Sequence, residues 1–150
     1  IRNAARALIL QDDNILLLRK DGYETGERFA LPGGGQDLRE TLEQALIREC
    51  MEEIGTPVEI RDLVFVADSF KPPDTSPGST RHLVEFLFAC TVPDDYVPMN
   101  GHHPDKHQVE VVWSRLDELA NMPLYPRSLA PYLADSNGSS GSVYLGTIDW

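Results

Sequence analysis

Residues 34–56 read GGQDLRETLEQALIRECMEEIGT, and the rest of the chain is organised around them. A glycine turn opens this stretch, a helix is predicted from about Leu38 to Ile54, and Gly55 ends the helix. Asp37 is the expected N-cap, with Glu40 three residues later as its capping-box partner. Apolar residues fill one arc of the helical wheel, which predicts packing against a core. They are Leu42, Leu46, Ile47, Cys50, Met51 and Ile54.

Three carboxylates, Glu49, Glu52 and Glu53, lie in the last turn and a half of this helix. At about 100° per residue, their side chains can point at one spot. Their mutual repulsion and the helix macrodipole both disfavour this arrangement at a C-terminus. A bound divalent cation would offset both effects, since carboxylate oxygens are ligands that Mg²⁺ and Mn²⁺ prefer. The alternative is a solvated acidic face, with Arg48 placed beside Glu52 to neutralise part of its charge.

The same stretch resembles the signature of the Nudix family, G-x5-E-x7-R-E-U-x-E-E-x-G-U, where U is a bulky apolar residue. All seven fixed positions are filled, a match expected by chance in about one window in 10⁸. The apolar positions hold Cys50 and Thr56, and Thr56 departs from the pattern. The fixed residues are Gly34, Glu40, Arg48, Glu49, Glu52, Glu53 and Gly55.

This resemblance implies an α/β fold, the Nudix-type α/β/α sandwich with a mixed β-sheet between helices. It also implies hydrolysis of a phosphoanhydride bond in a nucleoside diphosphate linked to another moiety, with Mg²⁺ or Mn²⁺ as cofactor. The implied metal ligands are Glu49, Glu52 and Glu53, together with the backbone carbonyl at Gly33. Such ions neutralise the diphosphate, orient it and acidify the attacking water.

A catalytic role is expected for Glu52, Glu53 and Arg48, the last as a partner that orients Glu52 or another carboxylate of the stretch. In-line attack by water at phosphorus also needs a general base. Glu53 is one candidate for that base. The others lie outside the stretch, in strands or loops, and the sequence leaves the choice open among Glu85, Asp105 and Glu110.

Basic residues elsewhere are candidates for binding the phosphates of a small-molecule substrate. Arg19 follows a predicted hairpin formed by residues 4–10 and 15–18, and residues 21–28 are expected to form a loop. Arg81 and His82 precede a strong apolar strand and are expected to meet an anionic substrate. Glu85 interrupts that strand, so it either faces the site or lies on the exposed side of an edge strand.

The substrate itself is less well defined by the sequence. Pro72 lies sixteen residues past the signature, and residues 76–78 read SPG, which is similar to a loop of family members that hydrolyse ADP-ribose. The acidic residues that those enzymes carry next are replaced here by Arg81 and His82. An ADP-ribose-like compound is therefore one candidate, beside dinucleoside polyphosphates, damaged nucleotides, nucleotide sugars and capped RNA.

Residues 1–135 are expected to form one Nudix domain, and residues 136–150 a flexible spacer with a short tail. A strand is predicted at residues 109–113 and a second helix at residues 127–134. The apolar tail from Tyr144 to Trp150 is expected either to dock as a strand or to contact a second copy in a homodimer. No apolar run approaches the ~20 residues that span a bilayer, so no membrane partner is expected.

The chain carries 24 acidic and 13 basic residues, for a net charge of −11. An acidic protein has no general attraction for nucleic acid, so a nucleic-acid partner is not favoured. Such a protein also needs cations to bind phosphates. Its two cysteines, Cys50 and Cys90, fall in apolar contexts and are predicted to be buried free thiols. This use of cysteine suits a reducing compartment, and the cytoplasm is the expected location.

Two other classes of function share the same scaffold. One is a ligand-binding sensor that keeps the fold without turnover, although a pure binder need not keep three metal-binding carboxylates. The other is an isomerase acting on an allylic diphosphate. An isomerase would need a reactive cysteine near the metal, and Cys50 is predicted to face the core.

Overall fold

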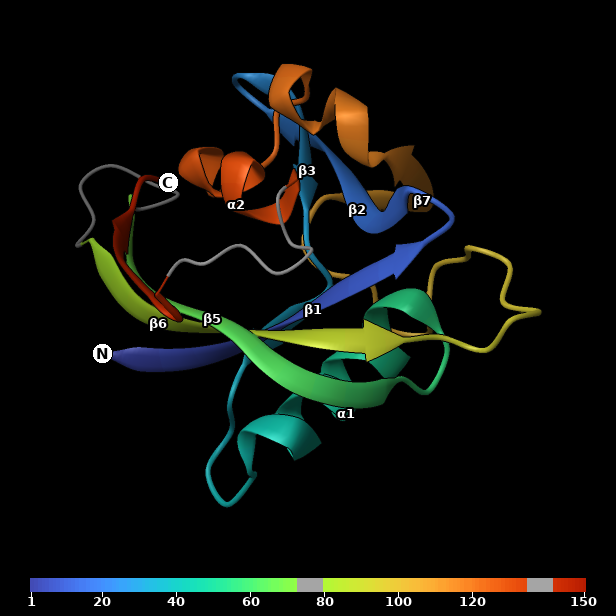
Figure 1. Cartoon of the computed structure of the whole chain (residues 1–150), viewed down its shortest axis with the longest axis horizontal. Helices are drawn as coiled ribbons and strands as arrows, with labels where there is room; N and C mark the ends of the chain where they lie inside the picture. Colours follow the sequence, from blue (N-terminus) through green and yellow to red (C-terminus); the bar gives the residue numbers. More distant parts are fainter. Residues whose placement is uncertain (73–79, 135–141) are drawn as a thin grey trace.

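The computed structural model describes residues 1–72, 80–134 and 142–150, and its centre is an 8-stranded mixed sheet (Figure 1). The elements in chain order are β1 (Arg2–Gln11), β2 (Asn14–Tyr23), β3 (Gly26–Ala30), β4 (Gly33–Gly35), α1 (Leu42–Ile54), β5 (Glu59–Lys71), β6 (Arg81–Thr91), β7 (Gln108–Arg115), the 3₁₀ turns η1 (Leu116–Asn121) and η2 (Arg127–Leu129), α2 (Ala130–Ala134) and β8 (Tyr144–Ile148). The main strand order is β3-β2-β1-β6-β5-β8, with β4 paired to β1 and β7 to β2. The β1–β6 and β5–β8 pairs are parallel and the others are antiparallel.

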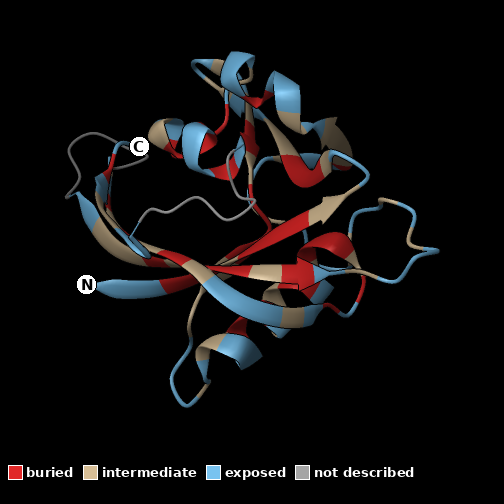
Figure 2. Ribbon diagram, viewed as in Figure 1, coloured by how far each residue is buried: buried red, intermediate tan, exposed pale blue. Residues whose placement is uncertain are grey.

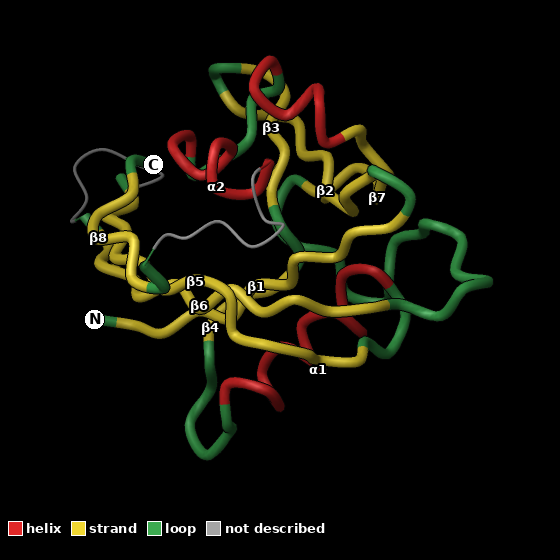
Figure 3. Tube along the Cα trace, viewed as in Figure 1, coloured by secondary structure: helices red, strands yellow, loops and turns green. Residues whose placement is uncertain are grey.

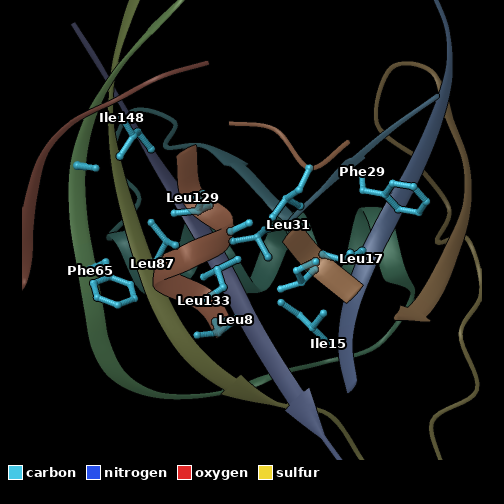
Figure 4. Close-up of a cluster of buried hydrophobic side chains, with 14 residues drawn as sticks. Leu8, Ile15, Leu17, Phe29, Leu31, Phe65, Leu87, Leu129, Leu133 and Ile148 are labelled. Carbon is cyan, nitrogen blue, oxygen red and sulfur yellow. The ribbon is translucent and has the colours of Figure 1, made fainter. Parts of the chain in front are cut away.

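Two apolar cores lie on opposite faces of the sheet, and each is covered by helical segments. In β2, Ile15 and Leu17 face the core that contains α2, whereas Leu16 and Leu18 face the core that contains α1. This two-residue alternation arises because successive strand side chains point to opposite faces. Figure 4 shows the α2 core, where residues of η2 and α2 meet β1, β2 and β6. The expected sandwich of helices around a mixed sheet is confirmed.

The predicted hairpin is also confirmed, because β1 and β2 pair antiparallel through a turn at Asp12 and Asp13. The prediction of a loop over residues 21–28 is wrong. Strand β2 continues to Tyr23, and β3 begins at Gly26 after a two-residue turn. Gly26 has φ of 88°, which a glycine adopts without strain, so the chain can turn here into a second hairpin. The polar composition of residues 21–28 concealed this hairpin in the sequence.

Helix α1 begins four residues later than the sequence predicted. Thr41 is the N-cap, and its hydroxyl accepts from the backbone N–H of Gln44 while the Gln44 side chain accepts from the Thr41 N–H. The chain therefore holds two consecutive capping-box patterns, residues 37–40 and 41–44, and the second one starts the helix. Arg39 has φ of 70°, a left-handed conformation that no continuous helix passes through. The predicted stop at Gly55 is confirmed, with φ of 71°.

One face of α1 is less buried than the helical wheel suggested. Leu46, Cys50 and Ile54 are fully buried, as predicted. Ile47 and Met51, however, keep 42% and 37% of their surface exposed. Figure 2 shows the underlying pattern, in which burial concentrates on the central strands and on the sheet-facing side of the helices. Both cysteines are buried and free, as expected.

The C-terminal tail joins the sheet. Strand β8 pairs parallel with β5, so docking as a strand is the alternative that the structure supports (Figure 3). Residues 127–134 are helical as predicted, although the first turn is 3₁₀. The SPG run at residues 76–78 and the predicted flexible spacer at residues 136–141 lie outside the described residues. Within the described residues, no helix has the length and apolarity needed to cross a membrane.

Candidate active site

The glycine loop before α1 is shaped by close backbone packing. Strand β4 pairs with β1, and a Cβ atom on Gly33 would stand 2.1 Å from the backbone oxygen of Ala5. A Cβ atom on Gly34 would stand 2.6 Å from the carboxyl carbon of Glu49. Real Cβ atoms do not approach other atoms this closely, so position 33 requires glycine, and a side chain at position 34 would displace the Glu49 carboxylate. The loop thereby brings backbone N–H and C=O groups against the carboxylates of α1.

Glu53 is the most buried of the three carboxylates, with 2% of its surface exposed. Its Oε1 atom accepts a hydrogen bond of 2.7 Å from the backbone N–H of Gly33. Burial raises the pKa of Glu53 to about 8, and the Gly33 hydrogen bond opposes that shift only in part. A buried carboxyl whose charge is this unfavourable gains from a nearby cation.

Arg48 connects the carboxylate of Glu40, which precedes α1, with carboxylates of the helix itself. Its strongest partner is Glu40, through Nε to Oε2 at 2.7 Å and Nη2 to Oε1 at 2.9 Å. It also donates to Glu49 at 3.0 Å, to Glu52 at 3.5 Å and to the Gly35 carbonyl at 3.0 Å. Hydrogen bonds from Arg48 hold the pKa of Glu40 down at about 2. The expected contact between Arg48 and Glu52 is present, but it is the longest of the set.

Glu40 therefore does not cap α1 as the sequence suggested. Its Oε1 accepts from the Asp37 backbone N–H at 2.8 Å, which closes the turn before the helix. Its two bonds to Arg48 span eight residues. The sequence contained the pair but no signal that joined them, because a capping box is the more local explanation for the same glutamate.

A divalent cation at this site would need the three helix carboxylates to converge on it. Within residues 1–72, 80–134 and 142–150, no three His, Cys, Asp or Glu side chains are gathered as an ion would require. Arg48 holds Glu49 and Glu52, and the Gly33 N–H holds Glu53. The donor chemistry nevertheless fits Mg²⁺ or Mn²⁺, since the set consists of carboxylate oxygens beside a glycine backbone that leaves them room. An ion would compete with Arg48 and Gly33 for these oxygens.

The carbonyl of Gly33 has a partner that the sequence did not predict. Arg6 donates from Nη1 to this carbonyl at 3.0 Å and from Nε to Glu85 at 2.9 Å. The other Glu85 oxygen accepts from the Ser69 hydroxyl at 3.3 Å. Glu85 is 2% exposed on β6, which lies between β1 and β5, so the edge-strand alternative for Glu85 is wrong. The one available signal was Arg6 itself, a charge within the apolar run of residues 4–10.

The other two candidate bases lie in different settings. Asp105 pairs with Lys20 and lines the cleft beside the glycine loop. Burial acts to raise the pKa of Asp105, but the neighbouring Lys20 ammonium prevails and the pKa lies below its usual value. Glu110 instead pairs with Arg19 at 2.9 Å across β2 and β7. Neither Arg19 nor Glu110 is among the described residues that line the cleft.

Arg81 and His82 do lie at the cleft, where they line the part nearest Gly34 and Glu49. The Nε2 atom of His82 is 2.7 Å from Oδ1 of Asp68. Its ring also stacks on Phe70, with 4.5 Å between the ring centroids. His82 is therefore held in place by residues of β5.

The loop before β7 completes the C-terminal end of α1. The N–H of Gly101 donates to the Glu53 carbonyl at 3.0 Å, and the N–H of His103 donates to the Glu52 carbonyl at 2.9 Å. The Gln108 side chain adds a second donor to the Glu53 carbonyl at 2.8 Å. These donors partly offset the unfavourable placement of anions at a helix C-terminus. The end of the helix that carries the carboxylates is thus fixed by contacts from a segment about fifty residues away in sequence.

Three hollows adjoin one another and share lining residues, so they form one cleft. The first, named here the carboxylate end, is lined by Gly33, Gly34, Gly35 and Glu49, with Glu52 and Glu53 on the same helix. The central hollow shares Arg6, Lys71 and Asp105 with it. The far hollow shares four residues with the central one and is named the aromatic end. Those four are Tyr23, Arg28, Tyr125 and Trp150.

Known proteins are similar to this chain in sequence. The family model described as NUDIX domain matches residues 1–135. The chain is 34% identical over 89 residues to an ADP-ribose pyrophosphatase of Methanocaldococcus jannaschii, a match covering 59% of this chain and 50% of that protein. It is 32% identical over 104 residues to a putative 8-oxo-dGTP diphosphatase 3 of Mycobacterium tuberculosis, covering 67% of this chain and 43% of that protein. The chain thus spans about half the length of these curated relatives or less.

Solved structures extend the similarity along nearly the whole fold. An ADP-ribose pyrophosphatase from Streptococcus suis superposes with a TM-score of 0.63 at 23% identity, covering 99% of this chain and 98% of that chain. A MutT NUDIX hydrolase from Burkholderia pseudomallei superposes with a TM-score of 0.67 at 27% identity, covering 91% and 98%. The first comparison establishes similarity of fold alone.

Proposed function

This chain belongs to the Nudix family, and from that premise we propose that it hydrolyses a phosphoanhydride bond in a nucleoside diphosphate linked to another moiety. The observation that carries the proposal is the carboxylate end. Glu49, Glu52 and Glu53 sit on one helix against a glycine loop, and Arg48 holds two of them. A diphosphate is anionic, and these three carboxylates would repel it unless bound cations neutralised them.

Mg²⁺ or Mn²⁺ held by Glu49, Glu52, Glu53 and the Gly33 carbonyl would supply charge neutralisation and a more acidic water. The protein supplies position. Arg48 and Gly33 orient the carboxylates, and the Gly101 loop fixes the end of their helix. Arg6 donates a hydrogen bond to the Gly33 carbonyl. Arg81 and His82 line the same end of the cleft, where they would contact phosphate oxygens.

Among the candidate bases outside α1, Asp105 has the strongest support. It lines the cleft, and Lys20 keeps its pKa low enough for it to be ionised at neutral pH. Glu85 is held by Arg6 and Ser69, and Glu110 is paired with Arg19. In this scheme Asp105 accepts a proton from the attacking water, whose oxygen bonds to phosphorus as the bridging P–O bond breaks. Two phosphorylated products result.

The substrate class is supported by the relatives. The two curated relatives are named for ADP-ribose and 8-oxo-dGTP, and each of these compounds is a nucleotide that contains a phosphoanhydride bond. ADP-ribose is our leading candidate, since it is the compound named for the relative with 34% identity. The isomerase alternative is disfavoured because Cys50 is fully buried and burial raises the pKa of its thiol.

The test is turnover of a panel with Mg²⁺ or Mn²⁺, read by product mass. The panel holds ADP-ribose, a dinucleoside polyphosphate, 8-oxo-dGTP and a nucleotide sugar. We expect cleavage of at least one compound into two phosphorylated fragments, and loss of cleavage on adding a chelator. Metal-dependent binding without any cleavage would favour the sensor, and conversion without a change of mass would favour the isomerase.

A further inference from the structure

The tail beyond residue 141 contributes to the cleft although it lies outside the family match, which ends at residue 135. Strand β8 pairs with β5, and Ile148 is 2% exposed within the α2 core (Figure 4). Past the strand, the Asp149 N–H donates to the Ser128 hydroxyl at 2.7 Å. These contacts fix the direction of the chain as it reaches Trp150.

Trp150 is itself held on two sides. Arg127 donates from Nε to the Trp150 carbonyl at 3.2 Å, which ties the backbone to η2. The Lys71 ammonium stands 5.1 Å from the centroid of the indole ring. The half-buried indole lines both the central hollow and the far hollow of the cleft. A large aromatic side chain is thus positioned at a cavity wall and is not packed into the core.

The aromatic end also carries a stacked group. The guanidinium of Arg28 lies 4.0 Å from the ring centroid of Tyr23 and 4.3 Å from that of Tyr125. The ring of His107 lies 4.6 Å from Tyr23. Planar aromatic and guanidinium faces are the surfaces on which nucleobases stack, largely without regard to base identity.

We propose that Trp150, supplied by the tail, is a substrate-binding residue that stacks on the nucleobase of the substrate at the aromatic end. The substrate would then pass through the central hollow, which is lined by Arg6 and Lys71, between the base at the aromatic end and the diphosphate at the carboxylate end. This inference rests on the proposed function, because it assumes that the diphosphate lies at the carboxylate end. The ligand class is a nucleotide with an intact base.

Fluorescence tests this inference without turnover, because the chain has two tryptophans and only Trp150 lines the described cleft. The probe is AMP with Mg²⁺, since AMP has no phosphoanhydride to cleave. We expect a saturable quench in the wild type and in Trp113→Phe, whose indole lies on β7 against the α1 core. The quench should be lost in Trp150→Phe, and ribose 5-phosphate, which lacks the base, should cause none.

Kinetics supply the second readout. Trp150→Ala should raise KM for the cleaved nucleotide about tenfold while kcat stays within about twofold, because stacking acts on binding. Trp150→Phe should stay near the wild-type KM, since a phenyl ring still stacks. The matched control is Tyr132→Ala, which removes an exposed aromatic ring from α2 on the same side of the sheet. Circular dichroism of each variant confirms that the fold is retained.

The outcomes separate this inference from the proposed function. Hydrolysis with equal KM values in wild type and Trp150→Ala overturns the role of Trp150 and leaves the hydrolase intact. The role of Trp150 is also overturned if the AMP quench persists in Trp150→Phe, is absent from the wild type, or is matched by ribose 5-phosphate. A Trp150-dependent quench without hydrolysis of any panel compound supports the stacking site and overturns the proposed reaction.

Discussion

The two ends of the cleft are built in different ways. At the carboxylate end, the glycine loop and the three helix carboxylates come from the continuous stretch of residues 33–55, in which the loop leads into α1. The aromatic end collects Tyr23 from β2, Tyr125 from the segment between η1 and η2, and Trp150 from the tail. More than 100 residues of sequence separate the first and last of these rings.

This difference separates the residues that would carry the reaction from those that would bind the base. Metal-binding carboxylates must hold a fixed spacing, so they are best carried by one rigid element, and their pattern is visible in the sequence. A surface for a nucleobase needs only planar faces at a cavity wall, and any segment can deliver them. Changes at the carboxylate end should therefore lower kcat, whereas changes at the aromatic end should raise KM.

The largest effect is expected at the carboxylate end. Glu52→Gln or Glu53→Gln should lower kcat at least about 100-fold, since each change removes a negative ligand from the metal site. The measurement is steady-state turnover with Mg²⁺, alongside circular dichroism to confirm the fold. Wild-type rates in both variants would show that these carboxylates do not carry the chemistry.

How far the sequence could predict this site depends on how local each contact is. The end of α1 at Gly55 and the grouping of Glu49, Glu52 and Glu53 follow from spacing within one helix. The bond from Arg6 to Glu85 spans 79 residues and depends on the parallel pairing of β1 with β6. No periodicity within a single strand specifies its partner in the sheet.

A smaller effect is expected from substitution of Glu40, which tests the role of its ion pair with Arg48. Glu40→Gln should lower kcat about tenfold, because partners that orient metal ligands contribute on this scale. It should also lower the melting temperature at neutral pH. The pKa of Glu40 is about 2 in the folded protein against a usual 4.5, so its stabilising contribution is present above pH 4.5 and lost as the pH falls toward 2.

The check is a series of melting temperatures between pH 7 and pH 2. The gap between wild type and Glu40→Gln should close as the pH falls through that window. Asp117→Asn is a suitable control, because Asp117 also pairs with an arginine, Arg115, at 2.6 Å but lies on the surface away from the cleft. A gap that stays constant with pH would mean that the ionised Glu40–Arg48 pair is not the source of the stability difference.

The aromatic end should respond in the other kinetic parameter. Tyr125→Ala removes one of the two rings that flank Arg28 and should raise KM about fivefold, with kcat within about twofold. Full saturation curves for wild type and variant provide the measurement. A fall in kcat at unchanged KM would erase the division between the two ends, since it would place Tyr125 in the reaction itself.

The smallest effect is expected for Arg19, which is compared with its neighbour Lys20 on β2. Arg19 pairs with Glu110 outside the described cleft lining, whereas Lys20 lines the cleft and pairs with Asp105. Arg19→Gln should therefore change kcat/KM by less than about twofold, since exposed ion pairs contribute little. Lys20→Gln should raise the pKa of Asp105, because it removes the cation that lowers it, and should move the acid limb of the pH–rate profile to higher pH. An unshifted acid limb in Lys20→Gln would remove Asp105 as the base, and a large loss in Arg19→Gln would return Arg19 to the substrate site.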